Sequence, residues 1–280
     1  MVKLGLIAGG GTLPLEIAQH CEQSGRPFFV IRLKGFSDPQ LEGFPGVEIG
    51  LAEVGKSIRA LKRAGCGAVC LVGNVARPDF AALKPDLKGL TLLPKLLLAA
   101  GKGDDALLRA VLDVFRSEGF AVEGAHEAKV DLTLAAGPIG KISPGPEHLA
   151  DISRAMDVAR AIGSQDIGQG AVVCNGLVLA VEAQEGTDAM LRRVAVEIRP
   201  ELKGKPGASR GVLAKVPKPI QERQIDLPTI GLATIQRAAA AGLAGVVGEV
   251  GGLLVLDREA VIALADDLGM FVFGVDPAGS

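Results

Sequence analysis

The sequence predicts an α/β protein of two domains, an N-terminal Rossmann-like parallel sheet with helices and a C-terminal mixed α/β domain. In the first half, short apolar runs alternate with amphipathic stretches, which is typical of parallel strands joined by helices. The chain has 38 Gly but only 9 Phe and neither Tyr nor Trp, which indicates an aliphatic core with many tight turns. Its 280 residues are enough for two domains of ordinary size.

The first domain is expected to alternate strands and helices from residue 3 to about 122. Ligands of parallel sheets collect beyond the carboxyl ends of the strands, and the loops there are Gly9-Gly10-Gly11-Thr12 and Gly73-Asn74. Gly10, Gly11, Thr12 and Asn74 are therefore candidate ligand-binding residues. The predicted strands are 4–8, 28–33 and 68–73, and the predicted helices are 13–24, 56–64, 92–100 and 104–117.

The three-glycine turn has more than one interpretation. Its backbone N–H groups can approach a phosphate, and the N-terminus of the following helix adds a favourable potential. A dinucleotide site fits less well, because the spacing is not GxGxxG and no acidic residue ends the second strand. The glycines are also explained if the turn only has to pack tightly.

The second domain begins near residue 136, after a stretch that interrupts the alternation. Residues 130–147 contain Gly137-Pro138, Gly140 and Pro144-Gly145-Pro146, which indicates a hinge or boundary. Asn175-Gly176 between two apolar runs predicts a hairpin of strands 170–174 and 177–181. Helices are expected at 147–162 and 188–195, and a mixture of strands and helices at 230–241, 245–247, 253–256, 258–267 and 270–275.

Polar clusters flank this hairpin on both sides. Gln169 and Gly170 lead into it, and a Glu-Gly-Thr-Asp turn follows it. Thr187 or Asp188 is expected to cap the next helix, and Asp188 with Glu185 also offers oxygen ligands for a hard cation. Capping does not explain Glu182 and Gln184 beside this turn.

The stretch from Lys215 to Gly231 reads as an active-site loop. Three prolines restrict its backbone, so that its polar side chains are held in a preset geometry. The alternative is an ordinary solvated connection. The candidate residues in this stretch are Lys215, Lys218, Gln221 and Asp226.

Composition excludes several classes of protein. A formal charge of −2 and the lack of Tyr and Trp argue against a nucleic-acid partner. The short apolar N-terminus that breaks at glycines predicts a first strand and not a signal peptide. Four cysteines without a metal-site pattern are expected to be buried reduced thiols, and cytoplasmic residence follows.

Six motifs in chain order resemble one family, the UDP-2,3-diacylglucosamine pyrophosphatases of lipid A biosynthesis of the α-proteobacterial, non-calcineurin-like type. The resemblance covers nearly the whole chain. It implies a hydrolase that depends on Mg²⁺, with Mn²⁺ as the other candidate ion, and that forms UMP and 2,3-diacylglucosamine 1-phosphate (lipid X). The motifs are Gly5 to Gly11, Gly73 to Pro78, Lys102 to Asp105, Asp166 to Gly170, Glu182 to Asp188 and Lys215 to Gly231.

The resemblance also implies roles for residues. Asp226 matches the family's essential acidic residue and is expected at the metal, with Asp188 as a second ligand. Lys215 matches the lysine that begins the proline-rich loop and is expected to be catalytic. The expected substrate contacts are Gly10, Gly11, Thr12, Asn74, Gln169, Gly170, Thr187, Asp188, Lys218 and Gln221.

On this interpretation, residues 1–135 bind the nucleotide, and residues 136–280 hold the catalytic and lipid-binding groups. The runs 238–247 and 253–256 are expected to line a chamber for the acyl chains. A transient contact with the inner face of the inner membrane and a homodimer are further expectations. The competing functions are a non-catalytic nucleotide-sugar sensor and a dinucleotide-dependent oxidoreductase.

Overall fold

The structure, a computed structural model, describes residues 1–76, 83–101, 104–205, 208–219 and 227–276. The chain forms two compact units. The N-terminal unit contains Met1–Val130, and the C-terminal unit contains the described residues from Asp131 onward. Among the described residues, no helix is long and apolar enough to cross a membrane.

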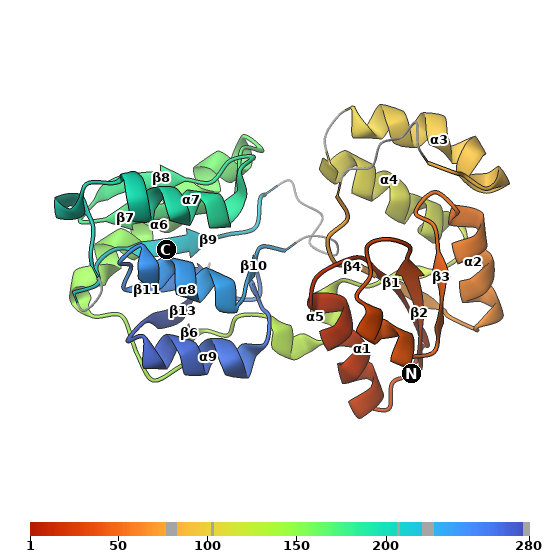
Figure 1. The fold of residues 1–280 in the computed structure, drawn as a ribbon, viewed down its shortest axis with the longest axis horizontal. Coiled ribbons are helices and arrows are strands. Elements are labelled where there is room, and N and C mark those ends of the chain that lie inside the picture. Colours follow the sequence, from red (N-terminus) through yellow and green to blue (C-terminus); the bar gives the residue numbers. More distant parts are fainter. Residues whose placement is uncertain (77–82, 102–103, 206–207, 220–226, 277–280) are drawn as a thin grey trace. The chain divides into compact units, whose positions relative to one another are not determined.

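The N-terminal unit is built on a five-stranded parallel sheet of order β3-β2-β1-β4-β5 (Figure 1). This order reverses direction between β1 and β4, which is where doubly wound sheets bind ligands. The strands are β1 (Leu4–Ala8), β2 (Phe28–Leu33), β3 (Gly46–Ile49), β4 (Ala68–Val72) and β5 (Ala121–Val122). The helices are α1 (Leu13–Gln23), η1 (Pro39–Gly43), α2 (Val54–Arg63), α3 (Leu87–Ala100), α4 (Asp104–Ser117) and α5 (Ala125–Ala128), and η2 (Val130–Leu132) crosses into the next unit.

Alternation along the strands divides the core of this unit between the two faces of its sheet. Ile7 and Ile31 pack with Leu61 of α2 and Phe115 of α4 on one face. Neighbouring residues such as Leu6 point to the other face, and α1 buries Ile17, Ala18 and Cys21. The four cysteines of the chain are free and buried, as expected.

The C-terminal unit is built on a six-stranded mixed sheet of order β6-β13-β11-β9-β7-β8. Strands β9, β11 and β13 are parallel, and β7, β8 and β6 pair antiparallel with their neighbours. Its strands are β6 (Gly137–Pro138), β7 (Gly170–Cys174), β8 (Leu177–Val181), β9 (Val212–Lys215), β11 (Gly245–Glu249) and β13 (Phe271–Val275), with β10 (Thr229–Ile230) and β12 (Leu254–Val255) as a separate parallel pair. Its helices are α6 (Pro146–Ser164), α7 (Gly186–Glu197), η3 (Pro200–Leu202), α8 (Leu232–Ala240) and α9 (Arg258–Asp267).

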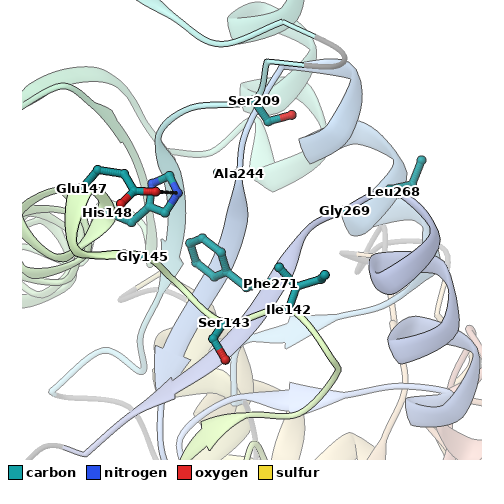
Figure 2. Close-up of a pocket in the computed structure, with 10 residues that line it drawn as sticks. All are labelled: Ile142, Ser143, Gly145, Glu147, His148, Ser209, Ala244, Leu268, Gly269 and Phe271. Atoms are coloured by element: carbon teal, nitrogen blue, oxygen red, sulfur yellow. Dashed lines mark ion pairs between the residues drawn. The ribbon is translucent and has the colours of Figure 1, made fainter.

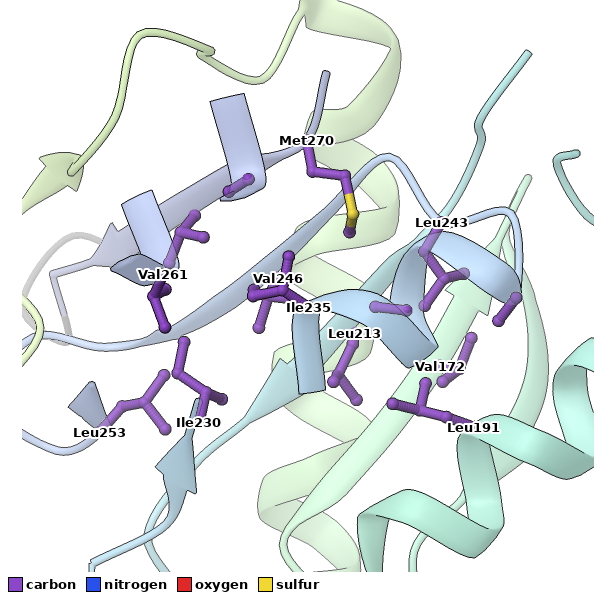
Figure 3. Packing of buried hydrophobic residues seen from close by; sticks show 14 of the residues in the cluster. Val172, Leu191, Leu213, Ile230, Ile235, Leu243, Val246, Leu253, Val261 and Met270 are labelled. Atoms are coloured by element: carbon purple, nitrogen blue, oxygen red, sulfur yellow. The ribbon is translucent and has the colours of Figure 1, made fainter. Parts of the chain in front are cut away.

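Helices cover both faces of this second sheet. Alternate strand residues, such as Val173 and Val212, pack against Met156 of α6. Their neighbours, such as Val172 and Leu213, pack in a second cluster with residues of α7, α8 and α9 (Figure 3). The sheet is therefore the middle layer of three.

The predicted fold class is confirmed, and most predicted elements occur within a few residues of their expected ends. The predicted strands 170–174 and 177–181 are β7 and β8, and Asn175 and Gly176 between them both have positive φ, as a two-residue hairpin turn requires. Residues 130–147 are more than a connection, because Gly137–Pro138 forms edge strand β6.

Three expectations differ from the structure. Helix α3 begins at Leu87 and not at 92, because the Asp86 carboxylate accepts from the Gly89 N–H and caps it. Strand β9 was not expected, and it makes Lys215 a strand residue and not the start of a loop. The runs expected to line an acyl chamber, around Val246 and Val255, belong to the packed core (Figure 3).

Candidate functional site

In the N-terminal unit, the two predicted loops meet at the point where the strand order reverses. Gly10 N donates to Asn74 O and Asn74 N donates to Gly10 O, each at 2.8 Å. Thr12 is exposed beside them at the N-cap of α1, and its side chain makes no capping hydrogen bond. The structure thus brings together Gly10, Gly11, Thr12 and Asn74, with the N-terminus of α1 next to them.

Packing explains part of the glycine turn. A Cβ on Gly9 would lie 2.8 Å from Asn74 O, and one on Gly10 would lie 3.0 Å from Phe36 O. Gly11 is different, because its φ of +87° is the conformation that favours glycine and a Cβ there would make only an ordinary contact, 3.7 Å from Asn74 Nδ2. The turn is therefore tightly packed at Gly9 and Gly10 and less so at Gly11.

In the C-terminal unit, four adjacent strands bring polar residues to one end of the sheet. We call Gln169, Glu182, Lys215 and Glu249 the polar edge. Lys215 and Glu249 end parallel strands β9 and β11, while Gln169 precedes β7 and Glu182 follows β8. This is the carboxyl end of the parallel strands, where α/β sheets bind ligands.

The register places Glu182, Gly170 and Lys215 in one row, while Gln169 and Glu249 lie one residue outside it along their strands. Gly170 lies opposite Lys215 on one side, and on the other side its carbonyl accepts from Glu182 N at 2.8 Å. Residues in one row project to the same face, so Glu182 and Lys215 flank Gly170 on the face that α7, α8 and α9 cover. A Cβ on Gly170 would lie 2.6 Å from Glu182 Oε2, so only glycine leaves the carboxylate this space.

The charged groups of the polar edge are buried. The exposed fractions are 5% for Lys215, 7% for Glu182 and 9% for Glu249. Burial of charge is unfavourable unless partners compensate it. Such residues at a ligand-binding sheet edge indicate function more strongly than stability.

Glu182 has one satisfied and one unsatisfied carboxylate oxygen. Oε1 accepts a hydrogen bond from Thr187 Oγ1 at 2.8 Å. Among the described residues, Oε2 of Glu182 and Oε1 of Gln169 are buried without a hydrogen-bond partner. Two buried oxygen acceptors without donors suit a hard cation or a hydrogen-bond donor of a ligand.

The lysines of the predicted loop have different environments. Lys215 Nζ donates to the carbonyl of Thr229 at 3.1 Å and is buried. Lys218 Nζ lies 2.8 Å from Asp166 Oδ1 in a partly exposed ion pair. Lys215 therefore has the geometry of a fixed internal cation, and Lys218 that of a surface residue.

The expected capping of the helix by Thr187 or Asp188 is not observed. Helix α7 begins at Gly186 with Glu185 as its N-cap, and no side chain provides a capping hydrogen bond. Thr187 instead donates to Glu182, and Asp188 forms an exposed ion pair with Arg237 of α8 at 3.2 Å. Thr187 thus belongs with the polar edge, whereas Asp188 makes a surface contact.

The other expected residues of the loop, Gln221 and Asp226, lie outside the described residues. Within the described part of the chain, no group of three or more His, Cys, Asp or Glu side chains could hold a metal ion. The oxygens of Glu182 and Gln169 fit the ligand chemistry of Mg²⁺, but they are only two of the ligands such an ion takes.

A hollow of about 450 Å³ lies at the opposite, amino end of the parallel strands (Figure 2). His148, in the first turn of α6, lines it with its ring 5.3 Å from that of Phe271, and Glu147 lies 3.5 Å from His148. We place the functional site at the polar edge and not here, because the buried charges and the orphaned oxygens are at the carboxyl end.

Glu182 and Glu249 were not among the candidate residues from the sequence. Each follows an apolar run, where a glutamate looks like the first solvated residue after a strand. The sequence did contain one indication that Glu182 has a function: it lies beside the Glu-Gly-Thr-Asp turn, and helix capping does not explain it.

Comparisons with known proteins agree with the motifs. Residues 3–132 match the family model described as LpxI N-terminal domain, and residues 135–273 match the LpxI C-terminal domain. A curated relative, UDP-2,3-diacylglucosamine pyrophosphatase LpxI of Caulobacter vibrioides, is 65% identical over 277 residues, which cover 99% of each chain. A solved structure of CobK precorrin-6A reductase is 14% identical with a TM-score of 0.32, over 99% of this chain and 88% of the other.

The resemblance inferred from the six motifs is therefore confirmed. The two family models together cover most of the chain, and the relative matches it from end to end. The chain belongs to the LpxI family.

Proposed function

We propose that this chain hydrolyses UDP-2,3-diacylglucosamine at its pyrophosphate, releasing UMP and 2,3-diacylglucosamine 1-phosphate in lipid A biosynthesis. The observation that carries the proposal is the 65% identity over 99% of both chains to a protein named for this activity. The buried charges of the polar edge support hydrolysis, because a protein that only binds its ligand has less need of them.

The uridine diphosphate part of the substrate suits the glycine loops of the N-terminal unit. Backbone N–H groups near Gly11 and the N-terminus of α1 favour phosphate oxygens, and the exposed Asn74 side chain offers an amide for polar contacts. Thr12 adds a hydroxyl at the same helix end. These residues bind and orient the substrate; they supply no proton transfer.

Lys215 has the best placement for the chemical step. Its buried ammonium group is held by the Thr229 carbonyl, so it stabilises negative charge that develops on phosphate oxygens without first having to move. Lys218 is a second cation for the phosphates, and it must leave Asp166 to reach them. Gly170 borders the Glu182 carboxylate, and Gln169 precedes Gly170 at the same end of the sheet.

Mg²⁺, or Mn²⁺ in its place, would neutralise phosphate charge and lower the pKa of a bound water. Glu182 is the described residue whose free carboxylate oxygen would hold it, with Thr187 fixing that carboxylate, and Gln169 Oε1 is a second buried acceptor at the same end of the sheet. Asp226 is the essential acidic residue by resemblance and is proposed as a further ligand or as the base that orients water. Asp188, paired with Arg237, is the weaker candidate ligand.

The proposed setting is cytoplasmic, with transient contact with the inner face of the inner membrane. A substrate with two acyl chains resides in a bilayer, so a protein without a spanning helix among its described residues has to meet it there. A homodimer is proposed from the resemblance alone.

The test is release of UMP from UDP-2,3-diacylglucosamine in detergent micelles, with Mg²⁺ and with EDTA. We expect release that EDTA abolishes and that falls by more than about a hundredfold in Asp226→Ala. Binding without release by the folded parent would instead support the nucleotide-sugar sensor. Neither binding nor release, together with binding of NAD(P)H, would support the oxidoreductase.

A further inference from the structure

Helix α3 carries a row of exposed leucines on its outward face. The row consists of Leu87, Leu90, Leu97 and Leu98, with exposed fractions of 87%, 57%, 43% and 73%. Their spacing places them along one side of the helix, and Pro94 lies exposed between them. We call these four residues the leucine row.

Helix α3 carries leucines on its outward side as well as on its packed side, unlike an ordinary surface helix. Such a helix buries its apolar stripe and exposes polar residues. In α3 the buried residues are Gly89 and Ala100, and the helix packs on α2 and α4 through its opposite side (Figure 1). Among the described helices and strands, α3 has the most exposed leucines.

The charges within α3 and just before it are mostly positive, and one of them, Lys88, is paired with Glu118 of the N-terminal unit. From residue 84 to residue 100 the charged residues are Lys84, Lys88 and Lys95, apart from Asp86. The Asp86 carboxylate is occupied by backbone N–H groups of α2 and α3. Lys84 and Lys95 are exposed, so the surface beside the row attracts anions.

We propose that the leucine row of α3 docks on a lipid surface that contains anionic phospholipids. Leucines with flanking lysines are the composition of helices that lie in the headgroup region, with the apolar face inserted and the lysines at the phosphates. The inference rests on the proposed function, because a substrate with two acyl chains requires the enzyme to work at a bilayer.

A second copy of the chain is the less suitable occupant. Fourteen helical residues are about 21 Å long and about 10 Å wide, so one face offers on the order of 200 Å². Stable protein interfaces bury roughly 800 Å² from each partner. A lipid surface needs no such area, since shallow insertion and charge attraction act together.

The experiment is flotation of the full chain with vesicles of phosphatidylcholine, with and without one third phosphatidylglycerol. We expect binding to the anionic vesicles and at least a tenfold weaker binding of the triple variant Leu87→Gln, Leu90→Gln, Leu98→Gln. Lys84→Gln with Lys95→Gln is expected to abolish the preference for phosphatidylglycerol. The matched control is Leu149→Gln with Val196→Gln, which changes exposed apolar residues of the C-terminal unit and should bind like the parent.

Circular dichroism and UMP release from micellar substrate accompany each variant. Unchanged spectra and micellar turnover with lost vesicle binding would establish docking as a separate property. Vesicle binding by the triple variant equal to that of the parent overturns the proposal, as does a parent that binds neither kind of vesicle. A changed oligomeric state with unchanged vesicle binding would assign the row to a second copy. Vesicle binding through α3 without any UMP release would reject the proposed function and leave the docking surface standing.

Discussion

At the scale of single residues, substitution of Glu182 is expected to lower activity without lowering the stability of the fold. Its Oε2 is buried without a partner among the described residues, so the carboxylate is a cost to the folded state. We expect Glu182→Gln to be as stable as the parent or more stable, because the variant removes a buried charge and adds N–H donors. UMP release should nevertheless fall by about a hundredfold, and half-maximal activity should need more Mg²⁺.

The control for this variant is Glu185→Gln. Glu185 lies in the same turn but forms a surface pair with Arg193 at 3.2 Å, so its loss should change turnover by less than about twofold. Parent-like turnover of Glu182→Gln would remove Glu182 from the mechanism and leave Lys215 as the described catalytic candidate.

The thiols give a second prediction at this scale. Burial raises the pKa of Cys21, Cys66, Cys70 and Cys174, so little thiolate exists at neutral pH. We expect alkylation by iodoacetamide at pH 7.5 to be at least tenfold slower than for free cysteine, and all four thiols to react in guanidinium chloride. Rapid labelling of the native chain at one position would show that its thiol is reached by opening of the fold.

At the scale of elements, one carboxylate joins two helices. Asp86 accepts from Gly89 N of α3 at 2.8 Å and from Lys56 N of α2 at 2.7 Å. Burial alone would raise the pKa of this carboxyl, but the backbone donors of Gly89, Gly55 and Lys56 bring it below its ordinary value. Asp86 thus fixes the start of α3, the helix with the leucine row, against α2.

A lowered folded-state pKa means that Asp86 contributes stability above the unfolded-state value, which is about 4. This contribution is lost as the pH falls through the folded-state pKa. We expect Asp86→Ala to lower the free energy of unfolding by about 1–3 kcal/mol at pH 7, with a smaller difference from the parent below pH 3. Urea unfolding at both pH values measures it. The control is Asp113→Asn, which alters an exposed pair with Arg116 and should change stability by less than about 0.5 kcal/mol. A loss of stability in Asp86→Ala that is the same at both pH values would contradict the capping role.

At the scale of the whole molecule, the position of the division between the units can be tested with fragments. Leu134 belongs to the C-terminal core, its N–H donates to Leu253 O at 2.8 Å, and Arg258 donates to the carbonyls of Asp131 and Thr133. A fragment of residues 131–280 keeps these contacts, and one of residues 136–280 loses them. We expect the shorter fragment to be less stable by roughly 2–5 kcal/mol, the cost of deleting a buried leucine. Equal urea midpoints would show that residues 131–135 do not belong to this unit.

Much of the fold follows from local patterns. Asn175-Gly176 defines a hairpin whose strands need no distant partner to be recognised, and apolar runs ending in glycine identify β1 and β4. Strand β9 was missed because its run of three apolar residues, Val212 to Ala214, is too short to show a period. Its place depends on β7 and β11 on either side, which is information that no local window contains.

The candidate site likewise contains some residues that could be predicted from the sequence and others that could not. The loops of Gly10 and Asn74 could be placed at one end of the sheet from the sequence, because parallel strands end at a shared edge, and the structure pairs them. Glu249 could not be assigned, because its importance comes from burial and from lying at the end of the strand next to Lys215. Burial of a charged residue depends on packing over the whole unit, and an acidic side chain in a sequence normally indicates solvent.

The exposed face of α3 is also suited to a fluorescence measurement. Since the chain contains no tryptophan and no tyrosine, a single Leu98→Trp substitution would give it its one indole, placed on a helix that has no aromatic side chain. Indole emission shifts to shorter wavelength when the ring leaves water, so the colour of that one signal would report the polarity around α3. Quenchers carried at known depths in a bilayer would then measure how far the helix enters.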